Sequence, residues 1–329
     1  MLILTAQDVR QALPMHQAIE AMKQAYAAFS AGEAEVPLRT RLPVAPHDAL
    51  VLFMPAYVRS GLDEALAVKV VSLFPENPKH NLAYIQAAVL VLEANSGRAQ
   101  ALLEGATLTA IRTGAAGGAA IDLLARPESQ TLAIFGAGVQ GRTQLEAACT
   151  VRPIKTVWVY DPNPQRACAF VSEMAGRGPI PQDLRIAETP SQAVQQADII
   201  CTATTSSTPV FADADVKPGT HISAVGSYTP QMQEIPSETV ARSRVFVDSR
   251  QAVLAEAGDL IQPIHQGIFG EEHIYAELGE VVLGRKHGRL SPDEITFFKS
   301  VGLAVQDALA AQLALKNALK MGLGQVVNW

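Results

Sequence analysis

The stretch TLAIFGAGVQGRTQLEAA, residues 131–148, constrains the fold more than any other part of the chain. An apolar run leads into Gly136, Gly138 and Gly141, and a helix-like pattern begins directly after them. Glycines at this spacing between a buried strand and a helix let the backbone approach a pyrophosphate at the helix N-terminus. Asp161 ends the next apolar run, TVWVYD, where an acidic side chain hydrogen-bonds ribose hydroxyls. The stretch therefore predicts a dinucleotide-binding unit.

Strand-like and helix-like segments alternate from residue 131 onward. We expect strands at TLAIFGAG, TVWVYD, ADIICTAT, HISAVGS and SRVFVDS, with helices over 141–150, 163–176 and 190–197. This alternation predicts a parallel sheet with helices on both faces. The strand ends at Thr202, Thr204, Val225 and Gly226 are expected to line the cofactor, because strand carboxyl ends face the ligand crevice. Ordinary strand-end turns are the alternative interpretation.

The first third of the chain has a different pattern. Residues 8–31 indicate an amphipathic helix that Pro14 interrupts, and residues 107–124 a helix of small residues. Between them lie the short apolar runs PLRTRLPV, ALVLFMPAYV, ALAVKVVSLF and QAAVLVLEA, with Asn95-Ser-Gly97 as a hairpin turn. These features predict a mainly antiparallel sheet with a leading helix.

The segment GLAVQDALAAQLALKNALK, residues 302–320, predicts a helix that is apolar nearly all round and needs burial on several sides. We place it back against the first third. The predicted fold class is therefore α/β, with a Rossmann-type doubly wound parallel sheet inserted into a mainly antiparallel α+β domain. The predicted boundaries are 1–118 plus 303–329 for a substrate-binding and dimerisation domain, and 119–302 for the Rossmann domain.

Composition excludes several classes of protein. Of the 329 residues 48% are apolar and 18% charged, and the net charge is −6 without a long Lys/Arg run, which argues against nucleic-acid and membrane surfaces. Neither a signal peptide nor an uncharged 18-residue apolar run is expected from the pattern. Three unpatterned cysteines suit a reducing compartment, and we expect a cytoplasmic protein. No His pair has metal-ligand spacing, so no metal is expected.

Cationic side chains occur in apolar settings of the first third. Lys69 lies inside ALAVKVVSLF, Arg112 interrupts LTAIRTGAAGG, and Arg39 and Arg41 alternate along one predicted strand. A lysine in a strand core is costly without a partner. Together these cations are suited to grip a carboxylate, for which Arg is the better bidentate donor. Structural ion pairs are the alternative interpretation for each residue taken alone.

At this point the chain resembles the ornithine cyclodeaminase/mu-crystallin family over its full length. The resemblance is carried by MPAY, the Lys69 strand, AIRTGAAGG, GAGVQ, KPGTHISAVG, ELGEVV and GLAVQD in the same order. It implies a Rossmann domain inserted into a dimerising substrate domain, and a homodimer. It also implies that Arg39, within the pattern Pro37-Leu-Arg39-Thr40, binds the substrate carboxylate beside the nicotinamide together with Lys69 and Arg112. The cofactor-binding residues so predicted are Thr113, Gly136, Ala137, Gly138, Val139, Gln140, Asp161, Thr202, Ala203, Thr204, Val225 and Gly226.

The chain departs from the family pattern at Tyr228. Cyclodeaminating members carry an aspartate in the V-G-x-D segment, and this chain has Val225-Gly-Ser-Tyr228. Oxidative deamination needs a base, whereas reduction of a protonated imine needs orientation and hydride delivery. The interpretation is therefore an NAD(P)H-dependent reductase of Δ1-pyrroline-2-carboxylate or Δ1-piperideine-2-carboxylate. Tyr228 either donates a proton or lines the pocket. The alternatives are an amino-acid dehydrogenase or ornithine cyclodeaminase, and a non-catalytic, crystallin-like NAD(P)-dependent ligand-binding protein.

The cofactor is expected to be NAD(H) or NADP(H), with NAD(H) favoured. Asp161 would repel a 2′-phosphate, and Pro162 and Asn163 follow it in place of an arginine. Arg166 is the residue that would favour NADP(H) instead.

Overall fold

The computed structural model describes residues 1–60 and 63–328, and the chain forms two compact units. Met1–Arg112 and Leu303–Trp329 make up the first, here called the terminal unit, and Thr113–Gly302 make up the central unit. The chain passes from one to the other inside helix α3 (Gly105–Leu124), the helix in which the predicted boundary at 118/119 also lies.

The terminal unit is built on an eight-stranded sheet with the order β16-β1-β7-β6-β5-β4-β2, and β3 pairs with β4. All of its pairs are antiparallel except β1 with β7. The strands are β1 (Leu2–Leu4), β2 (Ala34–Glu35), β3 (Thr40–Val44), β4 (Ala49–Ser60), β5 (Asp63–Leu73), β6 (Ile85–Leu92), β7 (Ala99–Glu104) and β16 (Gln325–Val326). The helices that belong wholly to this unit are α1 (Ala6–Ala12), α2 (Met15–Ala31) and α11 (Ala304–Met321). The predicted break at Pro14 and the antiparallel strands are confirmed.

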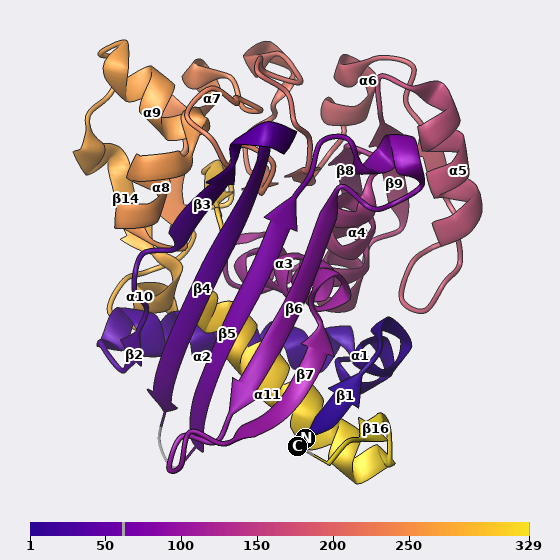
Figure 1. Cartoon of the computed structure of the whole chain (residues 1–329). Helices are drawn as coiled ribbons and strands as arrows, with labels where there is room; N and C mark the ends of the chain where they lie inside the picture. Colours follow the sequence, from indigo (N-terminus) through magenta and orange to yellow (C-terminus); the bar gives the residue numbers. More distant parts are fainter. Residues whose placement is uncertain (61–62, 329) are drawn as a thin grey trace. The chain divides into compact units, whose positions relative to one another are not determined.

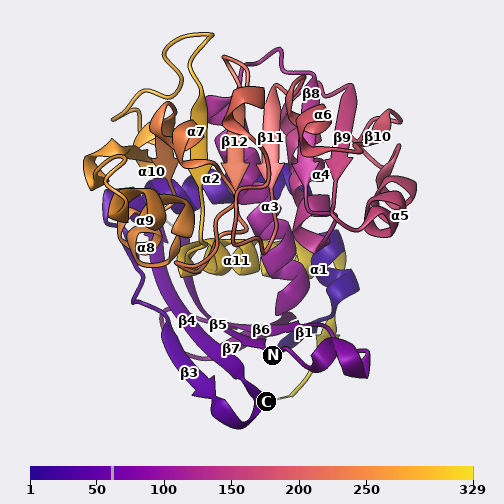
Figure 2. The same cartoon turned by 90° about the horizontal axis from the view of Figure 1, so that it is seen from above.

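One face of this sheet is covered by α2 and α11, as the two views in Figure 1 and Figure 2 show. Side chains alternate between the faces of a strand, and Met54, Lys69 and Val89 stand opposite one another on the covered face, where all three are buried. The apolar C-terminal helix therefore packs against the elements predicted to bury it.

Strand β3 is shorter than predicted. The four residues 36–39 stand opposite only three residues of β4, 54–56, because Glu35 pairs with Tyr57 and Thr40 pairs with Phe53. The extra residue interrupts the ladder, and Pro37 has no N–H to donate. Arg39 therefore precedes the strand, and the expectation that Arg39 and Arg41 lie along one strand is wrong.

The central unit is a doubly wound parallel sheet with the order β10-β9-β8-β11-β12-β15-β13-β14. Its strands are β8 (Thr131–Phe135), β9 (Thr156–Tyr160), β10 (Leu184–Ile186), β11 (Ile199–Thr202), β12 (His221–Ala224), β13 (Arg244–Val247), β14 (Ile274–Glu277) and β15 (Thr296–Lys299). Its helices are α4 (Val139–Val151), α5 (Pro164–Met174), α6 (Pro190–Val194), α7 (Ser237–Ala241), α8 (Arg250–Glu256), α9 (Gly258–His265) and α10 (Leu278–Val282). The predicted parallel α/β fold is confirmed, whereas β10, β14 and β15 were not predicted.

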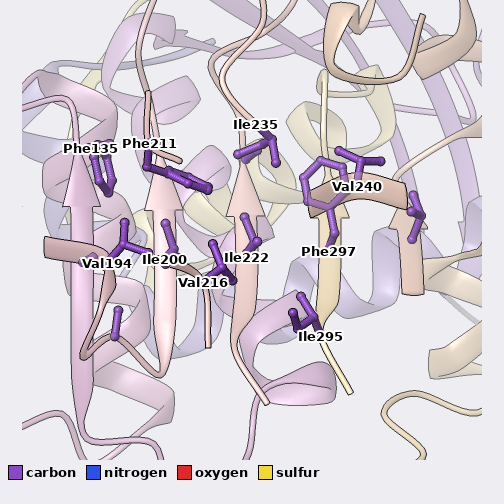
Figure 3. Close-up of a cluster of buried hydrophobic side chains, with 14 of the residues drawn as sticks. Phe135, Val194, Ile200, Phe211, Val216, Ile222, Ile235, Val240, Ile295 and Phe297 are labelled. Atoms are coloured by element: carbon purple, nitrogen blue, oxygen red, sulfur yellow. The ribbon is translucent and has the colours of Figure 1, made fainter. Parts of the chain in front are cut away.

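Apolar cores lie on both faces of the parallel sheet. Adjacent residues of one strand enter different cores: Leu132 and Ile134 belong to one cluster, and Ala133 and Phe135 to the other. Figure 3 shows the second cluster, in which Phe135, Ile200 and Ile222 project from neighbouring strands to the same side. Burial on both faces explains why these strands are continuous apolar runs in the sequence.

Within residues 1–60 and 63–328, no helix combines the length and apolar character that crossing a bilayer requires. The same residues contain no cluster of three or more His, Cys, Asp or Glu side chains arranged to hold a metal ion. Cys149 and Cys201 are buried free thiols, and Cys168 is an exposed one.

Candidate active site

The glycine turn of the central unit lies between β8 and α4. Gly136 has φ 96°, in the left-handed region, and a Cβ there would stand 2.6 Å from the carbonyl oxygen of Ala203. Gly138 precedes α4, and a Cβ at Gly138 would meet no atom of the described residues within 4 Å. No side chain of these residues caps the N-terminus of α4. At Gly141 a Cβ would stand 2.1 Å from the Gly136 carbonyl oxygen, so the helix packs tightly on the turn. The start of α4 therefore has open space beside Gly138 and no side-chain cap on its N–H groups, which fits a pyrophosphate.

Asp161 follows β9 and is tied to this turn. Its Oδ2 accepts a 2.9 Å hydrogen bond from the Ala137 N–H, and its Oδ1 accepts one of the same length from the Asn163 N–H. Each oxygen keeps a further lone pair for a ribose hydroxyl. Gly136, Gly138, Asp161 and exposed Arg166 line one pocket of about 580 Å³ together with residues 203–206. The predicted adenosine site therefore has both its turn and its acidic residue in one cavity.

The ends of β11 and β12 lie beside each other in the sheet. Thr202 pairs with Ala224, and the Val225 N–H donates to the Thr202 carbonyl oxygen at 3.0 Å. A Cβ on Gly226 would stand 2.2 Å from the Thr204 carbonyl oxygen, so the loops after the two strands are in close contact. The structure thus brings together the strand-end residues that the sequence grouped as cofactor-lining.

Three further predicted cofactor residues are placed by helices. Val139 is the first residue of α4 and is exposed, while the Gln140 carbonyl oxygen accepts from the Thr143 hydroxyl at 3.1 Å. Thr113 in α3 is buried, and its carbonyl oxygen accepts from Gln144 Nε2 of α4 at 3.0 Å. This bond ties the Thr113 backbone to the helix that follows the glycine turn.

In the terminal unit, Lys69 and Arg112 meet on one carboxylate. Lys69 Nζ lies 2.7 Å from Asp307 Oδ2, and Arg112 Nε lies 2.9 Å from Asp307 Oδ1. All three side chains are buried. Lys69 comes from the covered face of β5 and Asp307 from the first turn of α11. Residues far apart in the sequence therefore form one charged cluster, here called the Asp307 cluster.

Arg112 is positioned by the start of α3. The Glu104 carboxylate accepts hydrogen bonds of 2.8 Å from the N–H groups of Ala106 and Thr107, which begins the helix directly after β7. Two turns later Arg112 reaches Asp307, and its Nη1 donates to Gln306 Oε1 at 3.0 Å. Gln306 Nε2 in turn donates to the Tyr26 hydroxyl at 2.7 Å. These bonds fix the orientation of the guanidinium group.

Burial sets the protonation behaviour of the Asp307 cluster. It lowers the pKa of Lys69 to about 8, Asp307 opposes that change, and Arg112 and Arg39 add to it. Burial alone would raise the pKa of Asp307, but Arg112 and Lys69 together lower it below its ordinary value. The cluster carries an excess of positive charge when Lys69 is protonated, which suits a carboxylate ligand.

Arg39 is half-buried and close enough to Lys69 to influence its pKa, whereas Arg41 is exposed in β3. Tyr228 is half-buried in the loop after β12 of the central unit. The sequence analysis missed Asp307 and Gln306 as site residues, although both lie in the quoted block GLAVQD. The signal was a pair of polar residues at the start of an otherwise apolar helix.

The chain is similar to known proteins over nearly its full length. The model of the ornithine cyclodeaminase/mu-crystallin family matches residues 1–322. The chain is 40% identical over 330 residues to Δ1-pyrroline-2-carboxylate reductase of Bacillus cereus (strain ZK / E33L), covering 100% of both chains. The solved structure of Thermococcus litoralis Δ1-pyrroline-2-carboxylate reductase, in complex with NADH and L-proline, is 44% identical with a TM-score of 0.94, and the match covers 99% of this chain and 100% of the other. An archaeal alanine dehydrogenase dimer with bound NAD is 32% identical with a TM-score of 0.92, covering 100% of this chain and 99% of its own.

Proposed function

The chain belongs to the ornithine cyclodeaminase/mu-crystallin family, and from this we propose that it is an NAD(P)H-dependent reductase of a small cyclic imino acid. The substrate is Δ1-pyrroline-2-carboxylate or Δ1-piperideine-2-carboxylate, and the product is proline or pipecolate. The observation that carries the proposal is the full-length similarity to two reductases of the first substrate. The buried cations of the Asp307 cluster support it because they suit a carboxylate.

The cofactor fits the central unit, where the open space at Gly138 and the bare start of α4 accept phosphate. When bound, the reduced nicotinamide supplies a hydride to the imine carbon. Asp161 favours NAD(H) because its carboxylate faces the same pocket and would repel a 2′-phosphate. The nicotinamide cofactor is thus held by the residues between Gly136 and Gln140, by Thr113 and by the strand ends of β11 and β12.

The substrate carboxylate is held by Arg39, Lys69 and Arg112. Asp307 fixes the last two, so the cations are oriented before the substrate binds, which lowers the entropic cost of forming the clamp. Tyr228 stands where cyclodeaminating members carry an aspartate. Its phenol is a poor base near neutral pH, which favours reduction of a protonated imine over oxidative deamination.

An amino-acid dehydrogenase is the second candidate, favoured by the likeness to the archaeal alanine dehydrogenase. One assay separates the two. NADH and NADPH oxidation is followed with cyclic imines and with 2-oxo acids plus ammonia, and ammonia release from ornithine is followed with NAD. We expect the fastest turnover with a cyclic imine. Ammonia release from ornithine at a comparable rate, or faster turnover of an open-chain 2-oxo acid, would contradict the reductase assignment.

We propose further that the chain forms a homodimer through the face of the terminal sheet opposite α2 and α11. Pro55, Val68, Leu90 and Leu102 stand side by side across four strands of this face and are only half-buried. Within the described part of the terminal unit no helix covers them (Figure 1). A contiguous apolar sheet face of this kind is typical of a subunit interface.

The free thiols suit a reducing compartment, and we propose the cytoplasm. Burial raises the pKa of Cys149 to about 12 and also raises that of Cys201, so these two thiols stay protonated and unreactive. Detection of the chain in the cytosolic fraction of its host would test this placement.

A further inference from the structure

The central unit contains a second buried charged cluster that the proposed reaction does not use. It consists of Glu234, Asp259 and Lys299, and the side chains of all three are fully buried. Lys299 Nζ at the end of β15 lies 2.9 Å from Asp259 Oδ2 in the first turn of α9. This pair is neutral in sum, so Glu234 is the additional acid in the cluster.

Glu234 joins two loops that follow neighbouring strands. Its Oε1 accepts a 2.6 Å hydrogen bond from the Thr204 N–H, after β11. Its Oε2 accepts bonds of 2.8 Å and 3.2 Å from the N–H groups of Gly226 and Ser227, after β12. Each oxygen of this carboxylate therefore accepts hydrogen bonds from a different loop.

The backbone of Glu234 is itself fixed. Asp259 Oδ1 accepts hydrogen bonds of 2.6 Å and 3.0 Å from the N–H groups of Glu234 and Ile235, and Lys299 holds the other oxygen of Asp259. Ser227 Oγ donates to the Met232 carbonyl oxygen at 2.7 Å and accepts from the Asp259 N–H at 3.2 Å. The position of Glu234 is thus fixed by Asp259 at its backbone and by the two loops at its carboxylate.

The position of these loops in the sheet gives the cluster a function. In a doubly wound sheet, one half of the strands holds the adenosine part of a dinucleotide and the other half holds the nicotinamide part. Here β8, β9 and β10 form the half with the glycine turn and Asp161, and β11 and β12 begin the other half. The loop after β11 also lines the pocket that contains Asp161. We propose that Glu234 is a positioning residue that sets the spacing of the β11 and β12 loops for the nicotinamide half of the cofactor. This inference rests on the proposed nicotinamide cofactor.

The number of acceptor oxygens explains why an acid occupies this position. Burial raises the pKa of Glu234 and Asp259 adds to that change, whereas Lys299 and the N–H of Thr204 oppose it. Glutamine has the same shape but offers one acceptor and one NH₂ donor. In a Glu234→Gln variant the NH₂ would face either the Thr204 N–H or the N–H groups of Gly226 and Ser227, and one loop would be released.

The test compares binding of NADH with binding of ADP-ribose, which lacks the nicotinamide. In Glu234→Gln we expect the Kd of NADH to rise at least tenfold and the Kd of ADP-ribose to rise clearly less, because Thr204 also lines the pocket that contains Asp161. The matched control is Asp198→Asn, since Asp198 also accepts two backbone N–H groups, those of Gln130 and Thr131, but does so at the start of β8 and not at the strand ends that face the cofactor. It should leave the NADH Kd within twofold.

Equal weakening of NADH and ADP-ribose, or an unchanged NADH Kd, would overturn the inference. If the native chain itself binds no NADH, the proposed function fails first, so the two failures are distinguishable. Hydrogen exchange on the native, cofactor-free chain decides the case if the variant does not fold. The amides of Thr204, Gly226 and Ser227 should be protected from exchange. If they exchange at the rate of an open loop, Glu234 does not fix the spacing of the β11 and β12 loops before the cofactor binds.

Discussion

Replacing Asp307 by asparagine should change the pH dependence of the enzyme and not only its rate. Asp307 is the carboxylate that opposes the lowering of the Lys69 pKa, which stands at about 8 in the native protein. Loss of an opposite charge in direct contact changes a pKa by about 1–3 pH units. In Asp307→Asn, Lys69 should therefore titrate roughly between pH 5 and 7.

The direction of the activity change follows from the charge that binds the substrate. A protonated Lys69 holds the carboxylate, so its contribution is present below its pKa and lost as the pH rises through it. At pH 7.5 a group of pKa about 8 is roughly three-quarters protonated, whereas one of pKa about 6 is roughly 3% protonated. The alkaline fall of kcat/KM for the imine should therefore move to lower pH by about 1–3 pH units in the variant.

The assay is kcat/KM for the cyclic imine at saturating NADH between pH 5.5 and 9.5. The imine titrates too, but its pKa is the same for both proteins, so a difference between the profiles belongs to the protein. Gln306→Met is the matched control, because it removes a neutral hydrogen-bond partner of Arg112 and leaves the charge of Asp307. It should lower kcat/KM without moving the alkaline fall. A profile for Asp307→Asn that is merely scaled down, with its fall at the native pH, would refute the reasoning.

Three other predictions concern the clamp, the cofactor and the assembly. Arg112→Ala should lower kcat/KM for the imine about 30- to 1,000-fold, or about 2–4 kcal/mol, with little effect on NADH binding, and survival of activity within threefold would make Arg112 structural. Asp161→Ser should raise kcat/KM for NADPH relative to that for NADH, because a carboxylate that repels the 2′-phosphate is removed. A native preference for NADPH of tenfold or more would show that Asp161 does not exclude the 2′-phosphate and that Arg166 contacts it. Val68→Glu, which adds a charge to the open sheet face, should halve the mass measured by light scattering, and a native chain that is monomeric at micromolar concentration would contradict the homodimer.

The parts of the fold that the sequence predicted are those encoded by local patterns. Gly136 and Asp161 each stand directly after an apolar strand, where their residue type is recognisable from the neighbouring sequence, and strand–helix alternation reports the parallel sheet directly. Strand β15, with the sequence TFFK, is too short for periodicity to show, and it enters the sheet between β12 and β13 through long-range pairing. Arg39 lies outside its predicted strand because the register with β4 leaves one residue unmatched.

The two buried lysines show what a sequence specifies and what it leaves open. Lys69 and Lys299 each lie in an apolar strand, and burial of an unpaired ammonium is so costly that a partner is implied for both. The identity of that partner is set by which helix start packs beside the lysine. In both cases it is an acid in the first turn of a helix, Asp307 in α11 and Asp259 in α9, where the helix dipole also favours a carboxylate. Asp307 is the only acidic residue of α11, so it is the only side chain of that helix that can neutralise a buried cation. A lysine in an apolar strand is therefore best matched to the acids at the starts of apolar helices.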